Sequence, residues 1–562
     1  MMAIYAARYP AEKMHIQFDK NLYNKEETIW YKIYLISGTQ LSDLSKNVYV
    51  EWYDTSGRMI KQTVAPLYQA TARGSFDIPA DYKGNFIHVK AYTRWMLNGD
   101  PDFLYERDLG VNTGKSTAKK QAPIIYKTTV TTFPEGGSLV EGLNSKIAFK
   151  ATNQFGYPVL IKGALVGKNN KFIDSIEVKH DGMGLFFLNP QPGEQYAIHW
   201  TDENGQTGIS PIAAPQKEGA KMAVLTTNDQ AIIQVERSDS ANSHFRKMNL
   251  LVHMNQALFF KVALNATERP ILNARIPIDQ LPTGILQFTL FTDDWVPISE
   301  RLVFINNHTH EFNVRFNTPE VNMDKRGKTV FEVYVPDTSF ANMSIAVTDA
   351  DVVQPDDHSI FSDILLSGDV HGKIHNPAYY LSSDADSVMS NLDLVMLTNG
   401  WRKFDWEKIR AGKFPDYKYP RETEFMALQG KVYGADRIST SMPLMLNLII
   451  VGKDSSKHFA FLPVDKQGNF YQNTYFYDTS RIFYSFNGNQ NLTNVTQVQF
   501  NNGLLRQVAK TIRYPHSAQP YLWSDSLAKL KLDHYLQEQE LLKKSMAATT
   551  LQEVVVKART KS

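Results

Sequence analysis

The chain has 562 residues, 43% of them hydrophobic and 12% aromatic, so it is too long for one core and must divide into several folded domains. Lys plus Arg (60) nearly balances Asp plus Glu (58), which gives no electrostatic reason to expect a nucleic-acid partner. There is no cysteine, which excludes disulfides, thiolate metal sites, a cysteine nucleophile and an internal thioester.

The first ten residues, MMAIYAARYP, lack the apolar h-region of a secretory signal. No run of 18 apolar residues follows, so we expect no membrane-spanning helix. If the natural protein is exported, we expect that its signal has been removed from this form.

Residues 12–35 alternate apolar and polar side chains on either side of a polar gap. Met14, Ile16 and Phe18 form the first series, and Ile29, Tyr31, Ile33 and Leu35 form the second. Side chains on a strand point to opposite faces with a period of two, so this pattern predicts two half-buried strands. The Asp/Asn/Lys-rich residues 19–28 are expected to connect them.

Similar strand-like runs recur along the chain, separated by Gly, Pro, Asn or Asp at the spacing of sandwich folds. Polar breaks fall at 112–123, 214–221, 306–311 and 413–423. They predict antiparallel β-sandwiches over 10–113, 124–213, 215–308, 311–412 and 423–510, followed by a helix and tail over 524–562. The fourth block is expected to contain a helical insertion.

Helical periodicity is confined mainly to two places. In 387–412, Leu392, Val395 and Met396 stand at helical spacing. In 524–545, Ser524 or Asp525 is a suitable N-cap. The apolar residues expected to pack in this second helix are Leu527, Leu530, Leu541 and Leu542.

Several segments resemble bacterial macroglobulin-like (MG2-type) domain proteins. Residues 12–35 resemble the opening hairpin of such a domain, with an aspartate, a tyrosine and then a Glu-Thr pair that begins an aromatic strand. Residues 88–111 are similar to its closing strands. The next domains of such proteins resemble 133–159 with 181–198, and also 284–305. A stretch characteristic of one bacterial group with these domains resembles VTDADVV, DILLSGDVHGKIHNPAYYL and LVMLTNGWRKFDW.

Two further segments resemble other modules of the same bacterial group. Residues 428–471, with a turn at Gly468-Asn469 before Phe470, are similar to a carboxypeptidase-regulatory-like β-domain. Residues 550–560, TLQEVVVKART, resemble the start of a TonB-dependent receptor plug, with Gln552 in place of a glutamate. The resemblance implies a Gram-negative cell-envelope location and an outer-membrane partner.

Candidate catalytic motifs are incomplete. GVNTGKS (110–116) has the Gly-Lys-Ser of a P-loop, but Leu109 stands where the first glycine is required, so a linker is favoured. STAK (116–119) and SLAK (526–529) lack the partner motifs of a serine–lysine enzyme, and there is no G-x-S-x-G elbow. We therefore assign no catalytic residue.

Candidate ligand sites are also weak. His308 and His310 would lie on one strand face with Glu311 adjacent, so a zinc or nickel site is conceivable, but no third ligand stands at a recognisable spacing. The remaining candidates are His371 with His375, the aspartates of 348–357, and Trp95, Trp401 and Trp406. Surface or structural roles for the histidines and aspartates, and core positions for the tryptophans, are the preferred interpretations. We assign no metal and no cofactor.

The sequence therefore predicts a non-catalytic scaffold of tandem β-sandwiches that binds other envelope proteins, located in the periplasm or at the outer membrane. Two alternatives remain open. One is a protease inhibitor of the alpha-macroglobulin type without a thioester, and the other is a glycan-binding module, which an exposed aromatic platform would indicate.

Overall fold

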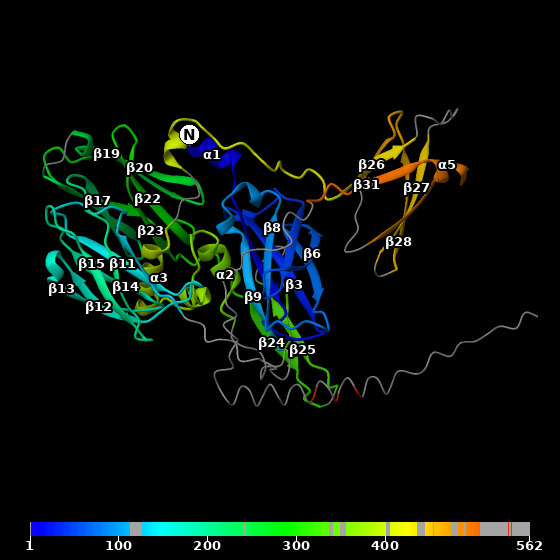
Figure 1. The fold of residues 1–562 in the computed structure, drawn as a ribbon, viewed down its shortest axis with the longest axis horizontal. Coiled ribbons are helices and arrows are strands. Elements are labelled where there is room, and N and C mark those ends of the chain that lie inside the picture. The colour runs from blue at the N-terminus through cyan, green and yellow to red at the C-terminus, as the bar shows by residue number, and fades with distance from the viewer. Residues whose placement is uncertain are drawn as a thin grey trace, which may run out of the picture.

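The computed structural model describes residues 2–112, 126–239, 243–324, 326–335, 341–348, 356–400, 405–434, 444–452, 455–473, 480–486 and 490–505, together with 538, 541 and 544. Within these ranges the chain is mainly β, and its sheets are antiparallel apart from one short parallel pairing. The expected fold class, a mainly β chain of tandem antiparallel sandwiches, is confirmed (Figure 1).

The first sandwich follows the alternation in the sequence. Its strands are β1 (Glu12–Phe18), β2 (Leu22–Asn24), β3 (Thr28–Ser37), β4 (Gln40–Leu41), β5 (Asn47–Tyr53), β6 (Met59–Pro66), β7 (Thr71–Asp77), β8 (Phe86–Thr93) and β9 (Tyr105–Asn112). Sheet β1–β3–β4, with β7 also on β3, packs on sheet β2–β9–β8–β5–β6 around one core. Ile16 lies opposite Ile33 as an antiparallel pair, so the expected hairpin is confirmed. Within the expected connection, β2 forms and pairs in parallel with β9.

The second and third sandwiches have the same two-layer plan, each around its own apolar core. The second comprises β10 (Thr129–Pro134), β11 (Ser145–Thr152), β12 (Ile161–Val166), β13 (Phe172–Glu177), β14 (Met183–Leu188), β15 (Ala197–Asp202) and β16 (Thr207–Pro211). The third comprises β17 (Ala220–Thr226), β18 (Gln230–Arg237), β19 (Lys247–Met254), β20 (Ala257–Asn265), β21 (Ile271–Pro277), β22 (Gly284–Thr292) and β23 (Pro297–Ile305). Their sheet orders are β10–β11–β14 on β13–β12–β15–β16, and β17–β18–β21 on β20–β19–β22–β23.

The fourth block differs from the expected sandwich over 311–412. Its described strands are only β24 (Arg315–Glu320) and β25 (Val330–Tyr334), which form a two-stranded sheet. The helices of the block follow these strands: α2 (Ile360–Ser362), the π-helical turn η5 (Asp363–Ser367), η6 (Pro377–Leu381), α3 (Asp386–Thr398) and α4 (Trp406–Arg410). The described strands of this block therefore form one layer, and they are followed by a helical segment that packs on other domains.

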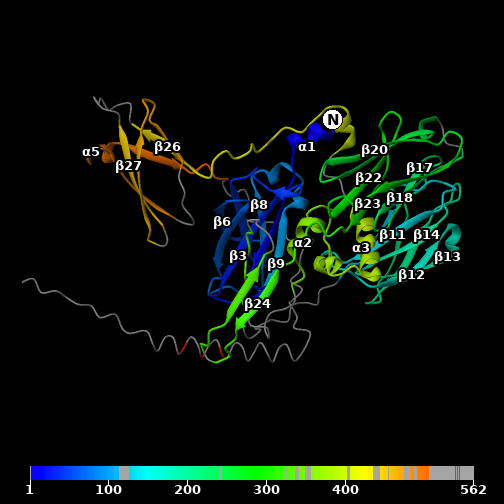
Figure 2. The same ribbon diagram turned by 180° about the vertical axis from the view of Figure 1, so that it is seen from behind.

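The helical segment 356–400 lies between the first three sandwiches (Figures 1 and 2). Leu392, Val395 and Met396 of α3 are buried, as their spacing predicted. They share a core with Met183 of the second sandwich and Phe304 of the third. On the other side, η5 contacts β1. Strand β1 is therefore buried on both faces, where the alternation alone predicted one buried face.

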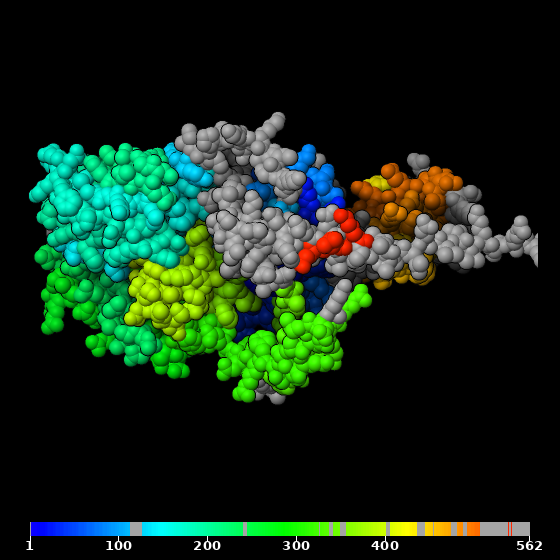
Figure 3. All heavy atoms as spheres, turned by 90° about the horizontal axis from the view of Figure 1, so that it is seen from below, coloured from blue at the N-terminus to red at the C-terminus, as the bar shows by residue number. Residues whose placement is uncertain are grey.

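The fifth sandwich stands on the side of the first that faces away from the second and third (Figures 1 and 2), and in Figure 3 it lies at the opposite end from them. Sheet β29–β26–β31 packs on sheet β28–β27–β30. The strands are β26 (Ala427–Tyr433), β27 (Met445–Val451), β28 (Lys457–Pro463), β29 (Asn469–Asn473), β30 (Arg481–Phe486) and β31 (Gln497–Asn501), with helix α5 (Gln490–Val495) before β31. The expected turn is present, with Gly468 at φ +85° and Asp465 accepting a hydrogen bond from the Asn469 amide.

Both ends of the fifth sandwich are attached to the first. Before it, the Glu422 carboxylate accepts hydrogen bonds from the backbone amides of Lys46 and Asn47. After it, Leu504 and Leu505 pack against the first core, and the Leu505 amide donates to Tyr49 Oη at 3.2 Å. The chain therefore leaves the first sandwich and returns to the same side of it.

The two ends of the described chain are helical. Helix α1 (Met2–Arg8) packs Met2 and Tyr5 against Ile409 of α4. Near the other end, residues 538, 541 and 544 are helical. Leu541 is 65% exposed, so the expectation that this leucine packs in an apolar contact was wrong. Leu527, Leu530, Leu542 and the tail 550–560 lie outside the described residues.

Candidate functional site

Buried charged groups connect the helical segment to all three neighbouring sandwiches. On β1, the Lys13 ammonium lies 2.7 Å from the Asp369 carboxylate and 3.1 Å from Asn255 Oδ1 of the third sandwich. Two residues further on, His15 Nδ1 lies 2.7 Å from Asp363 Oδ2. Because Lys13 and His15 are two apart, both project from the same face of β1 toward the helical segment.

Asp363 is held by histidines from two directions. Its second oxygen lies 2.8 Å from His358 Nδ1, and the carboxylate is almost fully buried. Burial acts to raise the pKa of Asp363, but the hydrogen bonds from His15 and His358 outweigh it, so the pKa lies below its ordinary value. The carboxylate is therefore ionised at neutral pH and binds the helical segment to β1.

A second ionic cluster joins the second and third sandwiches to α3. Arg301 of β23 donates from Nε to Glu135 Oε1 at 2.8 Å and from Nη2 to Asp393 Oδ1 at 2.5 Å. The Arg301 and Glu135 side chains are 2% and 6% exposed. A buried guanidinium requires this kind of pairing, since an unpaired charge in the interior costs several kcal/mol.

Further contacts attach the remaining faces of the helical segment. Arg107 of β9 forms an ion pair with Asp356, and Asp357 lies 3.7 Å away. Lys150 of β11 donates to Asn399 Oδ1 at 3.1 Å, and burial lowers the pKa of Lys150 to about 8. These contacts are structural in character, because each charged group is matched to a partner on another domain.

The histidine pair His371 and His375 lies in this interface. His371 Nε2 and Nδ1 lie 3.5 Å from Asp100 and 3.3 Å from Asp102 of the first sandwich. The His375 ring meets Tyr157 of the second sandwich edge-on. Asp356 and Asp357, from the candidate calcium loop, belong to the same interface, while 349–355 lie outside the described residues.

The candidate metal motif does not form the expected strand face. His308 and His310 lie in the turn after β23, and His308 has a positive φ of 54°. His308 Nδ1 lies 3.1 Å from Glu311 and Nε2 lies 3.1 Å from Asp384. The hydrogen bond to Glu311 raises the pKa of His308, which favours the imidazolium over a metal-binding imidazole. Among the described residues, no group of three or more His, Asp or Glu side chains is placed to hold a metal ion.

Of the three candidate tryptophans, the structure describes Trp95 and Trp406, and neither is fully exposed. Trp95 is buried and donates from Nε1 to the Pro10 carbonyl at 2.7 Å. Trp406 of α4 is half-buried and donates to Glu300 Oε1 at 2.8 Å. Trp401 lies outside the described residues, as do the P-loop-like residues from 113 onward and both S-x-x-K motifs.

A cavity of about 500 Å³ lies between α1, the first sandwich and α4. Its apolar wall is formed by Tyr5, Tyr9, Trp95, Phe103, Ile409 and Phe414. The Glu12 carboxylate at its base is already occupied by hydrogen bonds from Ser42, Ser45 and Thr93. The volume falls in the range of small-molecule sites, and the aromatic wall suits an apolar guest.

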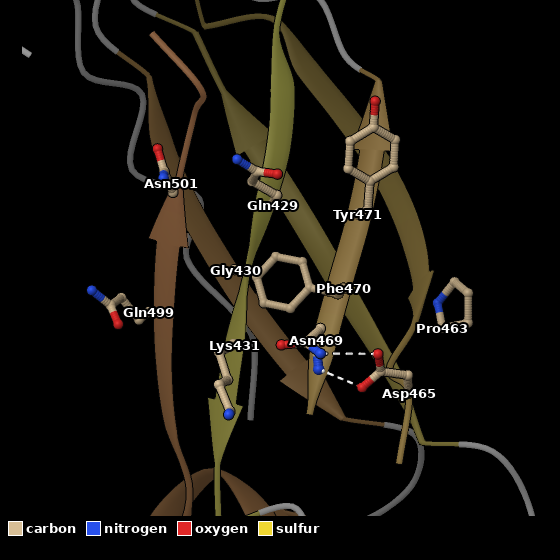
Figure 4. A pocket seen from close by; sticks show the side chains of 10 residues that line it. All are labelled: Gln429, Gly430, Lys431, Pro463, Asp465, Asn469, Phe470, Tyr471, Gln499 and Asn501. Carbon is tan, nitrogen blue, oxygen red and sulfur yellow. Dashed lines mark hydrogen bonds between the residues drawn. The ribbon is translucent and has the colours of Figure 1, made fainter. Parts of the chain in front are cut away.

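The fifth sandwich has two contrasting outer faces. On sheet β29–β26–β31 an open groove of about 640 Å³ is lined by amides and a tyrosine (Figure 4). The cross-strand rows are Tyr471–Gln429–Asn501 and Asn469–Lys431–Gln499. Gly430 lies between them, and a Cβ there would come within 1.9 Å of the Gln499 carbonyl oxygen. This face presents hydrogen-bonding groups to solvent.

The outer face of sheet β28–β27–β30 has an apolar centre, bordered by the polar side chains of Asn447, Lys457, Arg481 and Ser485. Ile449 of the central strand lies between Phe459 and Phe483 on its two neighbours. The exposed fractions of Phe459 and Phe483 are 65% and 56%, and Phe461 on the same face is 66% exposed. The inward positions of this sheet are filled by leucine, isoleucine, alanine, phenylalanine and Tyr484. Because one face of each strand is thus already apolar, alternation alone predicts polar residues on the outer face. The three outward phenylalanines are the signal that sequence reasoning missed.

No protein-family model and no curated protein matches the sequence. Among solved structures, Escherichia coli alpha-2-macroglobulin activated by porcine elastase shares 10% identity over 88% of this chain and 43% of that chain, with a TM-score of 0.21. Salmonella alpha-2-macroglobulin reacted with methylamine shares 8% over 87% and 39%, with a TM-score of 0.16. A tetra-tandem repeat from the extending region of a large adhesion protein shares 10% over 88% and 99%, with a TM-score of 0.14.

This chain thus spans less than half the length of the macroglobulin chains it matches. TM-scores of this size carry no argument about function. In the described ranges, no helix has the length and apolar character needed to cross a bilayer. The sheet topology described above defines the chain as a mainly β protein of tandem antiparallel sandwiches.

Proposed function

We propose that this protein is a non-catalytic scaffold that binds a protein partner through the outer face of sheet β28–β27–β30. The observation that carries the proposal is the row Phe459–Ile449–Phe483, with Phe461 beside it. Contiguous exposed apolar side chains on a soluble domain are characteristic of protein interaction sites, and buried aromatic anchors supply most of the binding energy in such interfaces.

The remaining domains support this role mechanically. The ionic contacts of Arg301, Asp363 and Lys13 hold the first three sandwiches and the helical segment together. The fifth sandwich is attached to this body through both of its ends. A partner bound to the fifth sandwich is thereby held at a defined place relative to the first.

We place the partner in the Gram-negative outer membrane, in a TonB-receptor-like assembly. This part of the proposal rests on sequence alone, through the resemblance of 550–560 to the start of a receptor plug. The envelope location has the same basis.

The test uses the tagged chain to capture partners from a detergent-solubilised outer-membrane fraction and, in parallel, from a cytoplasmic fraction. The captured proteins from the two fractions are then compared. The double variant Phe459→Asp/Phe483→Asp should lose the outer-membrane partner, because two charges would be buried without counter-ions. Phe187→Asp is the matched control, since Phe187 is 56% exposed on the second sandwich. Unchanged capture by the double variant would remove this face from the proposal.

A second candidate function is glycan binding at the amide-lined groove of Figure 4. It is favoured by Tyr471, 49% exposed beside Gln429, an arrangement in which a sugar ring would stack on the tyrosine and bond to the amide. Calorimetric titration with envelope oligosaccharides, comparing wild type with Tyr471→Ala, separates this candidate from protein binding. Trapping of proteases remains the other alternative.

A further inference from the structure

The strand segment of the fourth block forms a single layer instead of a sandwich. Strands β24 and β25 pair only with each other among the described strands. All six residues of β24 are exposed. A lone two-stranded hairpin is marginally stable in water, and it normally needs a third strand or a packed apolar face.

This hairpin has an apolar face without a described cover. Phe316 lies opposite Val333, and Phe331 shares that face because it is two residues from Val333. Phe316 and Phe331 are 74% and 65% exposed. The other face carries Arg315 opposite Tyr334 and Asn317 opposite Glu332.

The alternation begins before β24 and returns after β25. Phe312 and Val314 lead into Phe316 with the same period and are 63% and 38% exposed. In 341–348, Met343, Ile345 and Val347 alternate with small or polar residues and are 44%, 72% and 85% exposed. The polar side of this segment contacts the first sandwich, where Tyr34 Oη donates to Ser344 Oγ at 2.9 Å.

The chain has too little local sequence to build the second layer. Residues 306–355, about 50 in all, separate the end of the third sandwich from Asp356, which pairs with Arg107 of the first, whereas a sandwich of this kind needs about 100 residues. A second layer must therefore come from elsewhere.

We propose that a second copy of this chain supplies it, by packing the same face across a two-fold axis. Phe312, Phe316 and Phe331 together offer about 400 Å² of exposed apolar area. Val314 and Val333 lie on the same face, and since an interface of about 800 Å² per partner is only about 57% apolar, an apolar area of this size matches one stable interface. An isologous contact of this type is self-complementary by symmetry.

The charge of the segment also fits a second copy. Residues 311–332 contain four acidic and four basic side chains: Glu311, Glu320, Asp324 and Glu332 against Arg315, Lys325, Arg326 and Lys328. Two copies can therefore meet without net repulsion. Because 311–332 has no net negative charge, it does not attract the basic C-terminal residues Lys557, Arg559 and Lys561.

The first experiment measures mass by sedimentation equilibrium of the full chain from about 1 to 100 µM, a range in which typical interfaces saturate. Wild type should be a dimer at the upper end, and Phe316→Asp/Phe331→Asp should be a monomer. Phe172→Asp/Phe187→Asp, which changes two exposed phenylalanines of the second sandwich, should remain dimeric.

The second experiment uses the absence of cysteine from the chain. Val314→Cys should give a disulfide-linked dimer on mild oxidation, because the face meets its own copy. Val296→Cys, at a valine of matched exposure (37% against 38%), should stay monomeric under the same conditions.

A monomeric wild type without the Val314→Cys crosslink would overturn the proposal. A second result would also overturn it. If β24 amides are protected from exchange in a monomer, and deletion of 546–562 removes that protection, the face is covered by the chain's own tail. Both outcomes are independent of binding by the fifth sandwich.

Discussion

Replacement of Arg301 by methionine tests whether the buried ionic cluster holds the second and third sandwiches to α3. Methionine keeps most of the side-chain volume, so the main change is loss of the two ion pairs. Asp393 is 41% exposed and can be rehydrated, whereas Glu135 is 6% exposed and is left with Lys146 at 4.0 Å. Breaking a buried pair costs about 3–5 kcal/mol. Because Lys146 remains near Glu135, we expect the free energy of unfolding to fall by about 3 kcal/mol, the lower end of this range.

Differential scanning calorimetry of the full chain measures this loss. For a cooperative unit of about 200 residues, 3 kcal/mol corresponds to a downward shift of roughly 6–12 °C in the transition of these two sandwiches. Hydrogen exchange in β23 identifies which transition has moved. Arg275→Met is the matched control, because Arg275 is an exposed arginine of the same sandwich.

The double variant Arg301→Met/Glu135→Gln separates the two parts of the cost. If the loss comes from the buried Glu135 carboxylate, which keeps only Lys146 at 4.0 Å, neutralising Glu135 should restore part of the stability. A shift for Arg301→Met no larger than that of the Arg275→Met control would refute the reasoning.

Three further predictions concern other regions. Burial lowers the pKa of His253 to about 3, so below about pH 6.5 the unfolded chain binds a proton at this site and the folded chain does not. The folded state should therefore lose about 2 kcal/mol of stability between pH 6.5 and 5, and His253→Phe should remove this loss in urea titrations. Because the pKa of Asp363 is lowered in the folded state, its ionised form stabilises the fold above the ordinary carboxyl pKa near 4, and this stabilisation is lost as the pH falls further. Asp363→Asn should lower the free energy of unfolding by about 2–4 kcal/mol at pH 7 and make it less dependent on acid in the same titration. Deletion of 549–562 should leave the melting temperature nearly unchanged and weaken envelope association in fractionation. Unfolding of a sandwich would show instead that Val554–Val556 belong to a core.

The strands and the main helix could be predicted from the sequence because their signals are local. The alternation of Met14, Ile16 and Phe18 against Ile29–Leu35 fixes which side chains face the core, and the observed register follows it. The buried face of α3 follows likewise from the helical spacing of Leu392, Val395 and Met396. A period of two or of 3.6 is a property of neighbouring residues, so it can be seen without knowledge of the rest of the fold.

The candidate sites depended on contacts between distant segments. Lys13 and His15 are outward-facing residues of an ordinary strand pattern, and they become buried because residues 356–369, some 350 positions away, cover that face. Phe316 and Phe459 occupy outward strand positions as well, yet they stay exposed because no described element covers them. Alternation determines that a side chain points away from its own core, whereas the packing of other domains decides whether that side meets protein or solvent.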